Sequence, residues 1–178
     1  MKNIRTAVSS LLIIFYVVEL LAQSKVQPKL MLPIGHNGPV NSAVFSPDGS
    51  RVVTASFDKM ALIWDAQSGE LLNRLKGHTA DVYSAKFSPD GRRVITISED
   101  NTAIIWDAQN GALIHRLERH NNRFRSAEFS PDGLHVVTAS TDGTSIILDA
   151  QTGALLHRLV GHNDDISSVK FSPDGLHV

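Results

Sequence analysis

The chain has 178 residues, a formal net charge of −1 at neutral pH and no cysteine. The lack of cysteine excludes disulfide bonds and thiol catalysis, and the near-zero net charge gives no support for a surface that binds nucleic acid. No linker-like segment or block of like charges divides residues 35–178, so this region is expected to form one domain.

Residues 1–22 have the composition of a leader. Two basic residues near the start precede an uncharged stretch over residues 6–18, and Ala22 offers a small residue for cleavage. This layout is typical of a secretory signal peptide. An uncleaved membrane anchor is the alternative, but the uncharged stretch is shorter than the ~20 residues that span a bilayer, and Glu19 follows it. We therefore expect an exported protein of the periplasm, cell envelope or extracellular space, with membrane contact only if the leader stays uncleaved.

The remainder of the chain repeats every 42 residues. A Gly-His or Arg-His pair begins each unit, a Phe-Ser-Pro-Asp-Gly sequence follows, and two units contain Trp-Asp near their third quarter. A period of this length indicates a supersecondary unit that packs against copies of itself. The units are 35–76, 77–118, 119–160 and a partial 161–178.

Each complete unit is predicted to form four short strands. In the first unit, the first strand includes Val40 to Phe45 and ends in a tight turn, because Pro, Asp and Gly in Ser-Pro-Asp-Gly suit successive turn positions. The later strands are expected over 51–56, 61–64 and 71–75, which are rich in branched apolar residues. In the leader segment 23–34, residues 29–34 align with a fourth strand and are predicted to form one alone.

These motifs at fixed offsets resemble the WD-repeat (tryptophan-aspartate) β-propeller family over residues 29–178. The resemblance implies an all-β fold of four-stranded antiparallel blades, with about three and a half blades present in an incomplete ring. It also implies a noncatalytic scaffold that binds protein partners and needs no cofactor.

The family resemblance further implies a hydrogen-bonded tetrad in each blade, in which an indole, a hydroxyl, an imidazole and a carboxylate form a chain. We assign the hydroxyl to the serine two residues before the aspartate. In the third unit, Leu148 replaces the indole, so that blade is predicted to be the least rigid and to have room for a tryptophan. The predicted members are His36, Ser56, Asp58 and Trp64; His78, Ser98, Asp100 and Trp106; and His120, Ser140 and Asp142.

Three chemical alternatives are less favoured. Ser, His and Asp together suggest a hydrolase, but a triad serves one site with an oxyanion hole, and this trio recurs in three units. The histidines that begin the units could form a metal ring, yet each has a partner available in its own blade. The Asp residues at 65, 107 and 149 could bind calcium, although turn capping through backbone N–H groups explains them better.

Positions that differ between the copied units are the candidates for partner binding. In the family, the loops between fourth and first strands and the turns between second and third strands lie on one face around the channel. Aromatic and arginine side chains there are typical of interfaces; simple sequence drift at exposed positions is the alternative. The candidates are Phe57, Asp81, Tyr83, Glu99, Arg123 and Arg125.

The number of units does not complete a ring. Open blade faces expose apolar side chains and unpaired strand edges. A fragment of a longer exported protein is therefore expected, with self-association of two copies as the alternative. Functionally, the first hypothesis is an interaction scaffold; the alternatives are a regulatory propeller joined to a missing catalytic domain, and a propeller hydrolase.

Overall fold

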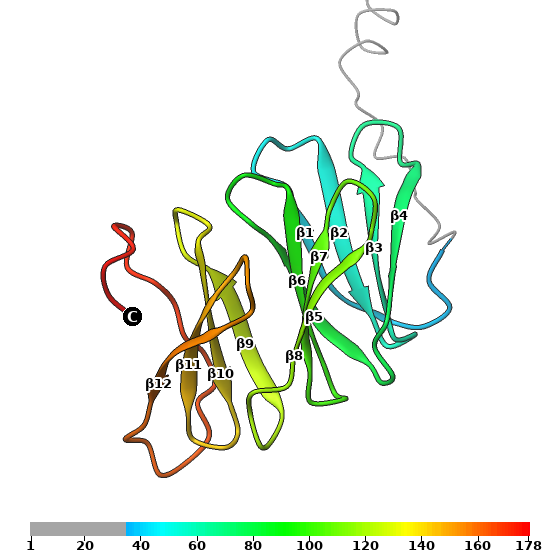
Figure 1. The fold of residues 1–178 in the computed structure, drawn as a ribbon. Coiled ribbons are helices and arrows are strands. Elements are labelled where there is room, and N and C mark those ends of the chain that lie inside the picture. The colour runs from blue at the N-terminus through cyan, green and yellow to red at the C-terminus, as the bar shows by residue number, and fades with distance from the viewer. Residues whose placement is uncertain (1–34) are drawn as a thin grey trace, which may run out of the picture. The chain divides into compact units, whose positions relative to one another are not determined.

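The computed structural model describes residues 35–178, so the expected signal peptide and the lone strand at 29–34 lie outside the described residues. Three four-stranded antiparallel sheets make up the described part (Figure 1). This confirms the all-β prediction of propeller-like blades in an unclosed ring. The strands are β1 (Val40–Phe45), β2 (Arg51–Ser56), β3 (Met60–Asp65), β4 (Leu71–Lys76), β5 (Val82–Phe87), β6 (Arg93–Ser98), β7 (Ala103–Asp107), β8 (Leu113–Leu117), β9 (Phe124–Phe129), β10 (His135–Ser140), β11 (Ser145–Asp149) and β12 (Leu155–Leu159).

Each sheet comes from one repeat and follows chain order, as β1-β2-β3-β4, β5-β6-β7-β8 and β9-β10-β11-β12. We call these the first, second and third blades. Hairpins connect the neighbouring strands, and the Ser-Pro-Asp-Gly turn closes the first hairpin of each blade. There the Gly49 amide donates to the Ser46 carbonyl at 2.9 Å, and Gly49 has a φ of 71°, which favours glycine. Within residues 35–178 no helix is long and apolar enough to cross a membrane.

The partial fourth unit, residues 161–178, forms no strand in the structure. It keeps the reverse turn of the other units, with the Gly175 amide 2.8 Å from the Ser172 carbonyl. It is attached to the third blade by the Ile166 amide, which donates to the Ser140 carbonyl at 3.1 Å. All of its side chains are exposed or half-buried. A partial blade was expected here, and the structure has its turn without its sheet.

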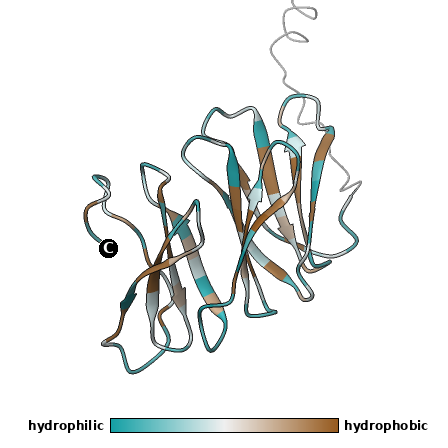
Figure 2. Ribbon diagram, in the orientation of Figure 1, coloured by the Kyte–Doolittle hydropathy of each residue, from teal (hydrophilic) through white to brown (hydrophobic). Residues whose placement is uncertain are grey.

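The apolar core lies between the blades. One cluster joins the first and second blades and includes Leu75, Val82 and Trp106. A second cluster joins the second and third blades and includes Leu117 and Phe124. Figure 2 shows the corresponding pattern, with hydrophobic residues along the strands and hydrophilic residues in many of the turns. Burial of these faces is the main force that holds successive blades together.

An arginine at the start of the second strand reaches from one blade to the next. Arg51 donates to the Gly91 carbonyl at 2.6 Å and to the Ala108 carbonyl at 3.3 Å, and its guanidinium lies 5.3 Å from the Phe87 ring centroid. Arg93 repeats these contacts on the third blade, at 2.7 Å to Gly133 and 3.0 Å to Ala150. We call this arrangement the arginine clamp; the first and second joints are both built with it.

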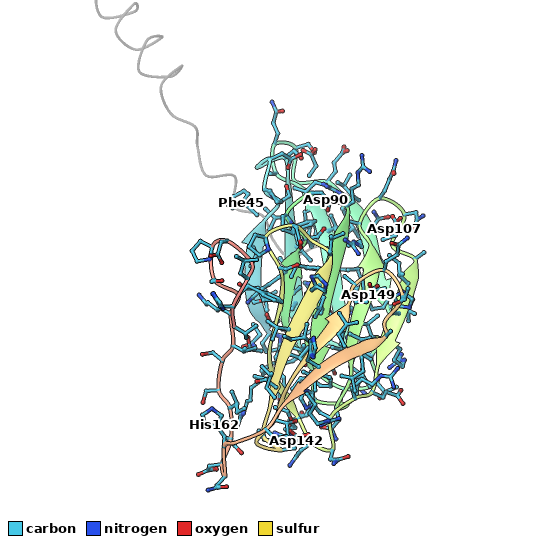
Figure 3. All side chains as sticks on the ribbon, turned by 60° about the vertical axis from the view of Figure 1, so that its left-hand side comes forward. Phe45, Asp90, Asp107, Asp142, Asp149 and His162 are labelled. Atoms are coloured by element: carbon cyan, nitrogen blue, oxygen red, sulfur yellow. The ribbon has the colours of Figure 1, made fainter. Side chains whose placement is uncertain are left out.

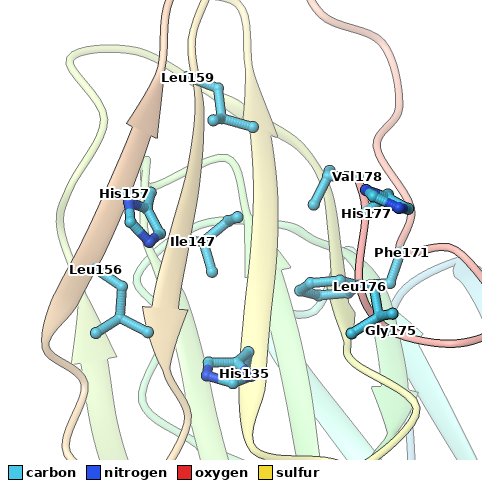
Figure 4. Close-up of a pocket in the computed structure, with 10 residues that line it drawn as sticks. All are labelled: His135, Ile147, Leu156, His157, Leu159, Phe171, Gly175, Leu176, His177 and Val178. Atoms are coloured by element: carbon cyan, nitrogen blue, oxygen red, sulfur yellow. The ribbon is translucent and has the colours of Figure 1, made fainter.

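The outer faces of the first and third blades are more open than the joints. Phe45 is 64% exposed, whereas Phe129 at the same place in the third blade is 5% exposed. Leu159 is 40% exposed, against 2% for its counterpart Leu117. A cavity of about 440 Å³ separates the third blade from residues 171–178 (Figure 4). The predicted self-association through such faces stays a prediction.

Candidate interaction face and the polar networks behind it

The blades have two distinct ends. In Figure 3, Asp142 and His162 lie at one end of the strands, while Phe45, Asp90 and Asp107 lie at the other. The first end carries the loops that enter each blade and the turns between its second and third strands, and we call it the loop end. The second carries the Ser-Pro-Asp-Gly and Trp-Asp turns, and we call it the turn end.

A buried polar network joins the loop end of each blade to its interior. In the second blade, the Trp106 indole Nε1 donates to the Thr96 hydroxyl at 2.8 Å, and that hydroxyl lies 2.7 Å from His78 Nε2. His78 Nδ1 lies 3.0 Å from the Asp100 carboxylate. The carboxylate also accepts the Thr79 amide at 2.8 Å, which fixes the loop that enters the blade. Each polar side chain of this network thus has a hydrogen-bond partner, as burial requires.

The hydroxyl of this network is a threonine, so the assignment to Ser56, Ser98 and Ser140 was wrong. Strand register is the reason: Trp64 lies opposite Val52, and Thr54 lies opposite Leu62. Thr54 is therefore the diagonal neighbour of Trp64, which a long aromatic side chain can reach. The hydroxyl groups of the three blades are those of Thr54, Thr96 and Thr138.

The serines that precede the network aspartates make a different set of hydrogen bonds. The Ser98 hydroxyl donates to the Ala80 carbonyl at 3.0 Å and accepts the Asp100 amide at 3.2 Å. Ser56 makes the same pair of bonds to Gly38 and Asp58. These serines therefore connect the entering loop to the turn before the third strand. They are polar and buried like the threonines, so residue type alone does not distinguish the two roles.

Burial and hydrogen bonding shift the pKa values in the networks. Burial lowers the pKa of His78 and of His120, although the neighbouring carboxylates act in the opposite direction. For Asp142, burial acts to raise the pKa, but hydrogen bonds from Thr144 and the Asn121 amide outweigh it and lower the pKa to about 2. His78 and His120 are accordingly neutral at pH 7, with Nδ1 donating to an ionised carboxylate.

The third blade has a shorter network. His120 keeps its carboxylate, 3.1 Å from Asp142, and lies 2.9 Å from the Thr138 hydroxyl. Leu148 is fully buried where the other blades have an indole. Phe124, which replaces a valine of the other blades, packs its edge against the His120 ring at 4.8 Å between centroids. The aromatic contact that the indole makes with the histidine in the other two blades is thus made by Phe124 in the third.

The residue before each histidine changes together with the indole. A Cβ added to Gly77 would lie 2.8 Å from Trp106 Cη2, and one added to Gly35 would lie 2.9 Å from Trp64 Cη2. Neither glycine has a positive φ, so its role is to leave space rather than to adopt an unusual backbone. The third blade has Arg119 at this position and Leu148 in place of the indole. The residue before the histidine and the residue at the indole position therefore depend on each other for packing, and both change in the third blade. We call this pair of positions the packing unit.

The repeated aspartates at the turn end cap their own turns. Asp65 accepts the amides of Gln67 at 3.0 Å and Ser68 at 2.7 Å through one carboxylate oxygen. Asp107 and Asp149 make the equivalent pairs of bonds. Each carboxylate thus serves its own turn, which agrees with the capping interpretation rather than with a calcium cluster.

Four of the six candidates for partner binding form a continuous line across the three blades. The Phe57 and Tyr83 rings meet edge to face at 6.2 Å between centroids. Glu99 is among the groups that raise the pKa of the Tyr83 hydroxyl, and it is paired with Arg123 at 2.6 Å. Variable residues on neighbouring blades therefore contact each other at the loop end. The line runs from the first blade through the second to the third.

The other two candidates lie beside this line. Asp81 accepts the Glu99 amide through its backbone carbonyl at 2.9 Å. Arg125 lies 3.4 Å from Asp165 in the partial fourth unit. Sequence reasoning missed Asn41, whose side-chain amide donates to the Tyr83 carbonyl at 2.7 Å. Asn41 lies 42 residues before Tyr83, at the equivalent position of the preceding unit. Because equivalent positions of neighbouring units lie side by side, the repeat period could have predicted this contact.

The repeats, the blade topology and the networks define a class of protein, the antiparallel blade-repeat proteins. Residues 27–65, 69–107, 111–149 and 153–178 match the family described as WD domain, G-beta repeat. Since these segments make up most of the sequence, the chain belongs to the WD-repeat family.

Curated relatives match over single repeats. WD repeat-containing protein 38 of Mus musculus and of Homo sapiens are each 50% identical over 40 residues, which is 22% of this chain and 13% of the relative. Periodic tryptophan protein 2 of Saccharomyces cerevisiae is 57% identical over 35 residues, 20% of this chain and 4% of the relative. The match thus spans only a small part of these relatives.

Proposed function

We propose that this protein is a noncatalytic scaffold that binds another protein through the loop end of its blades. The observation that carries the proposal is the line Phe57–Tyr83–Glu99–Arg123. It includes two aromatic side chains and an arginine, the residue types that are enriched in protein interfaces, at one end of the three blades. The WD-repeat family and the WD-repeat relatives support a role in protein interaction.

The arrangement of the polar networks argues for a scaffold rather than an enzyme. Each network is repeated at one register in successive blades and satisfies its own donors and acceptors. A catalytic serine, by contrast, needs a single site with an oxyanion hole and a substrate cleft. The histidine networks therefore serve to stabilise the blades and to hold the entering loops in place.

The experiment compares the two ends of the molecule. Binding partners are isolated by cross-linking in the native host, and one partner is then purified and its affinity for the full chain measured by calorimetry. Phe57→Ala and Tyr83→Ala at the loop end should weaken binding, while Gln67→Ala and Gln109→Ala at the turn end should leave it unchanged. Loss of binding in the turn-end variants alone would refute the proposed face.

Export is a second part of the proposal and depends on residues 1–22. Expression in a secreting host, followed by N-terminal sequencing, should give a mature protein that begins at or near Gln23. The control is a variant with a charge inside the uncharged stretch, Ile13→Lys, which should stay in the cell because it disrupts the apolar segment. Recovery of the intact wild-type chain from the cytosol would contradict export.

A further inference from the structure

Tyr83 is the centre of a small cluster at the joint between the first and second blades. Its ring packs against the core cluster between the second and third blades. The Tyr83 and Phe57 rings also contact each other in a T-shaped arrangement, with an interplanar angle of 88°. Glu99 and Asp81 both raise the pKa of the Tyr83 hydroxyl, and Asp81 lies two residues before Tyr83 in the sequence. The first joint therefore combines two aromatic rings with the Asp81 carboxylate, while Glu99 is paired with Arg123 across the second joint.

The cluster has unused binding capacity. Phe57 is 39% exposed, which leaves a large apolar ring open to a partner. Glu99 is already paired with Arg123 at 2.6 Å. Among residues 35–178, the Asp81 side chain has no ion pair or hydrogen bond, although its carboxylate lies close enough to influence Tyr83. Phe57 and Asp81 hold the positions that Glu99 and Arg123 hold at the next joint, where the two side chains meet at 2.6 Å. This equivalence places the Asp81 carboxylate next to the exposed Phe57 ring, and such a pair attracts a cation through the ring quadrupole and the negative charge.

The local charge agrees with this. Burial raises the pKa of the Tyr83 hydroxyl, and Glu99 and Asp81 raise it further, while Arg123 opposes them. The next joint has the opposite chemistry, since Arg123 and Arg125 occupy the positions of Asp81 and Tyr83 there. The aromatic and acidic combination thus distinguishes the first joint of the described blades from the second.

We propose that Phe57, Tyr83 and Asp81 receive an arginine or lysine side chain from an extended segment of the partner protein. The cation lies against the aromatic pair and is neutralised by Asp81, while the aliphatic part of the side chain covers Phe57. This inference rests on the proposed function, because it specifies the chemistry of the partner at the same loop end.

The test uses the full chain and two probes: an acetylated and amidated Gly-Ser-Arg-Gly-Ser peptide, and the same peptide with glutamate in place of arginine. Amide shifts in proton–nitrogen spectra locate binding and give the affinity. The arginine peptide should shift the amides of Phe57, Asp81 and Tyr83, and the glutamate peptide should shift them less. Preference for the glutamate peptide, or shifts confined to the turn end, would overturn the inference.

Two variants give effects of opposite sign. Asp81→Asn should weaken arginine-peptide binding about threefold or more, because it removes the free carboxylate. Arg123→Gln should strengthen it by about twofold or more, because Glu99 loses its intramolecular partner and becomes available. Arg125→Gln is the matched control: it removes the same charge from a residue that is paired with Asp165, so its effect should be smaller than that of Arg123→Gln.

The direction in which each substitution changes the affinity for the arginine peptide tests the inference. If Arg123→Gln weakens arginine-peptide binding, or if Asp81→Asn leaves it unchanged in a variant whose spectrum shows a folded protein, the inference is wrong. A purified partner that depends on Phe57 and Tyr83 but is insensitive to Asp81→Asn would refute this inference alone and leave the proposed function intact. A partner that ignores the whole loop end would refute the proposed function.

Discussion

The second and third blades are copies in sequence and topology, yet they fill the same space in different ways. The second blade places the Trp106 indole over Gly77 and binds it to Thr96. The third has Leu148 and Arg119 instead, and its histidine packs against Phe124. The backbone is held in the same way in both blades, because the carbonyl of the residue before the histidine accepts a hydrogen bond from an arginine. Arg116 donates to this carbonyl at 2.6 Å in the second blade, and Arg158 donates to it at 2.9 Å in the third. The comparison shows that glycine in the Gly-His pair is present because the indole needs its space.

The largest effect is expected from Trp106→Ala. This change removes a fully buried ring and the donor to Thr96, and it should lower the free energy of unfolding by about 3–5 kcal/mol. The measurement is the midpoint of urea unfolding for the full chain, with Leu113→Ala, an exposed position, as the control. An unchanged midpoint for Trp106→Ala would contradict the role of the indole.

The threonine hydroxyls give the next largest effect and separate the two blades. Thr96→Val leaves both the Trp106 indole and His78 Nε2 without a partner, which should cost about 2–4 kcal/mol. Thr138→Val leaves only His120 Nε2 unpaired and should cost about 1–3 kcal/mol. Both are read from urea unfolding, and equal losses in the two blades would show that the indole bond adds nothing.

Placing a tryptophan in the third blade tests the packing unit. The sequence suggested room for one, but Arg119 has a Cβ where the indoles of the other blades require glycine. Leu148→Trp alone should therefore destabilise the protein by about 1–3 kcal/mol through overpacking. The double variant with Arg119→Gly should recover about 1–3 kcal/mol of this as coupling energy in a double-mutant cycle. Additive effects of the two substitutions would contradict the pairing.

The smallest effect is the dependence of stability on pH. His78 and His120 have folded-state pKa values below their ordinary value, so the unfolded chain binds more protons as the pH falls through about 6.5. Stability should be fully present above that pH and decrease below it. The urea midpoint at pH 7.5 and at pH 5.5 measures this; His78→Gln should reduce the difference, whereas His157→Gln, at an exposed position, should not. Identical midpoints at both pH values would contradict the neutral histidines.

The blade architecture could be predicted because its signals are local. Ser-Pro-Asp-Gly turns and runs of branched residues fix where strands begin and end, and their recurrence fixes the number of sheets. The network hydroxyl could not be predicted in the same way. Ser56 and Thr54 lie on the same side of one strand, and only the pairing of Trp64 with Val52 decides between them. Register between strands depends on the turn geometry as well as on the hydrophobic pattern, so the type of a single residue does not reveal its partner.

The variable positions show a similar limit. Their location at the loop end followed from the repeat, but the contacts of Phe57 with Tyr83 and of Glu99 with Arg123 depend on how neighbouring blades meet. These contacts are complementary, aromatic with aromatic and acid with base. They therefore stabilise the observed order of blades, which the shared core residues alone do not distinguish.

The arginine clamp has a consequence for how such a chain can lengthen. The second blade accepts Arg51 through Gly91 and Ala108, and it offers Arg93 to the blade that follows. A blade with acceptors on one side and a donor on the other fits a copy of itself, so an in-frame duplication of residues 77–118 recreates the arginine clamp on both sides. A duplicated blade would therefore keep its clamp contacts, and only the variable residues at the loop end would have to change to fit the new joint.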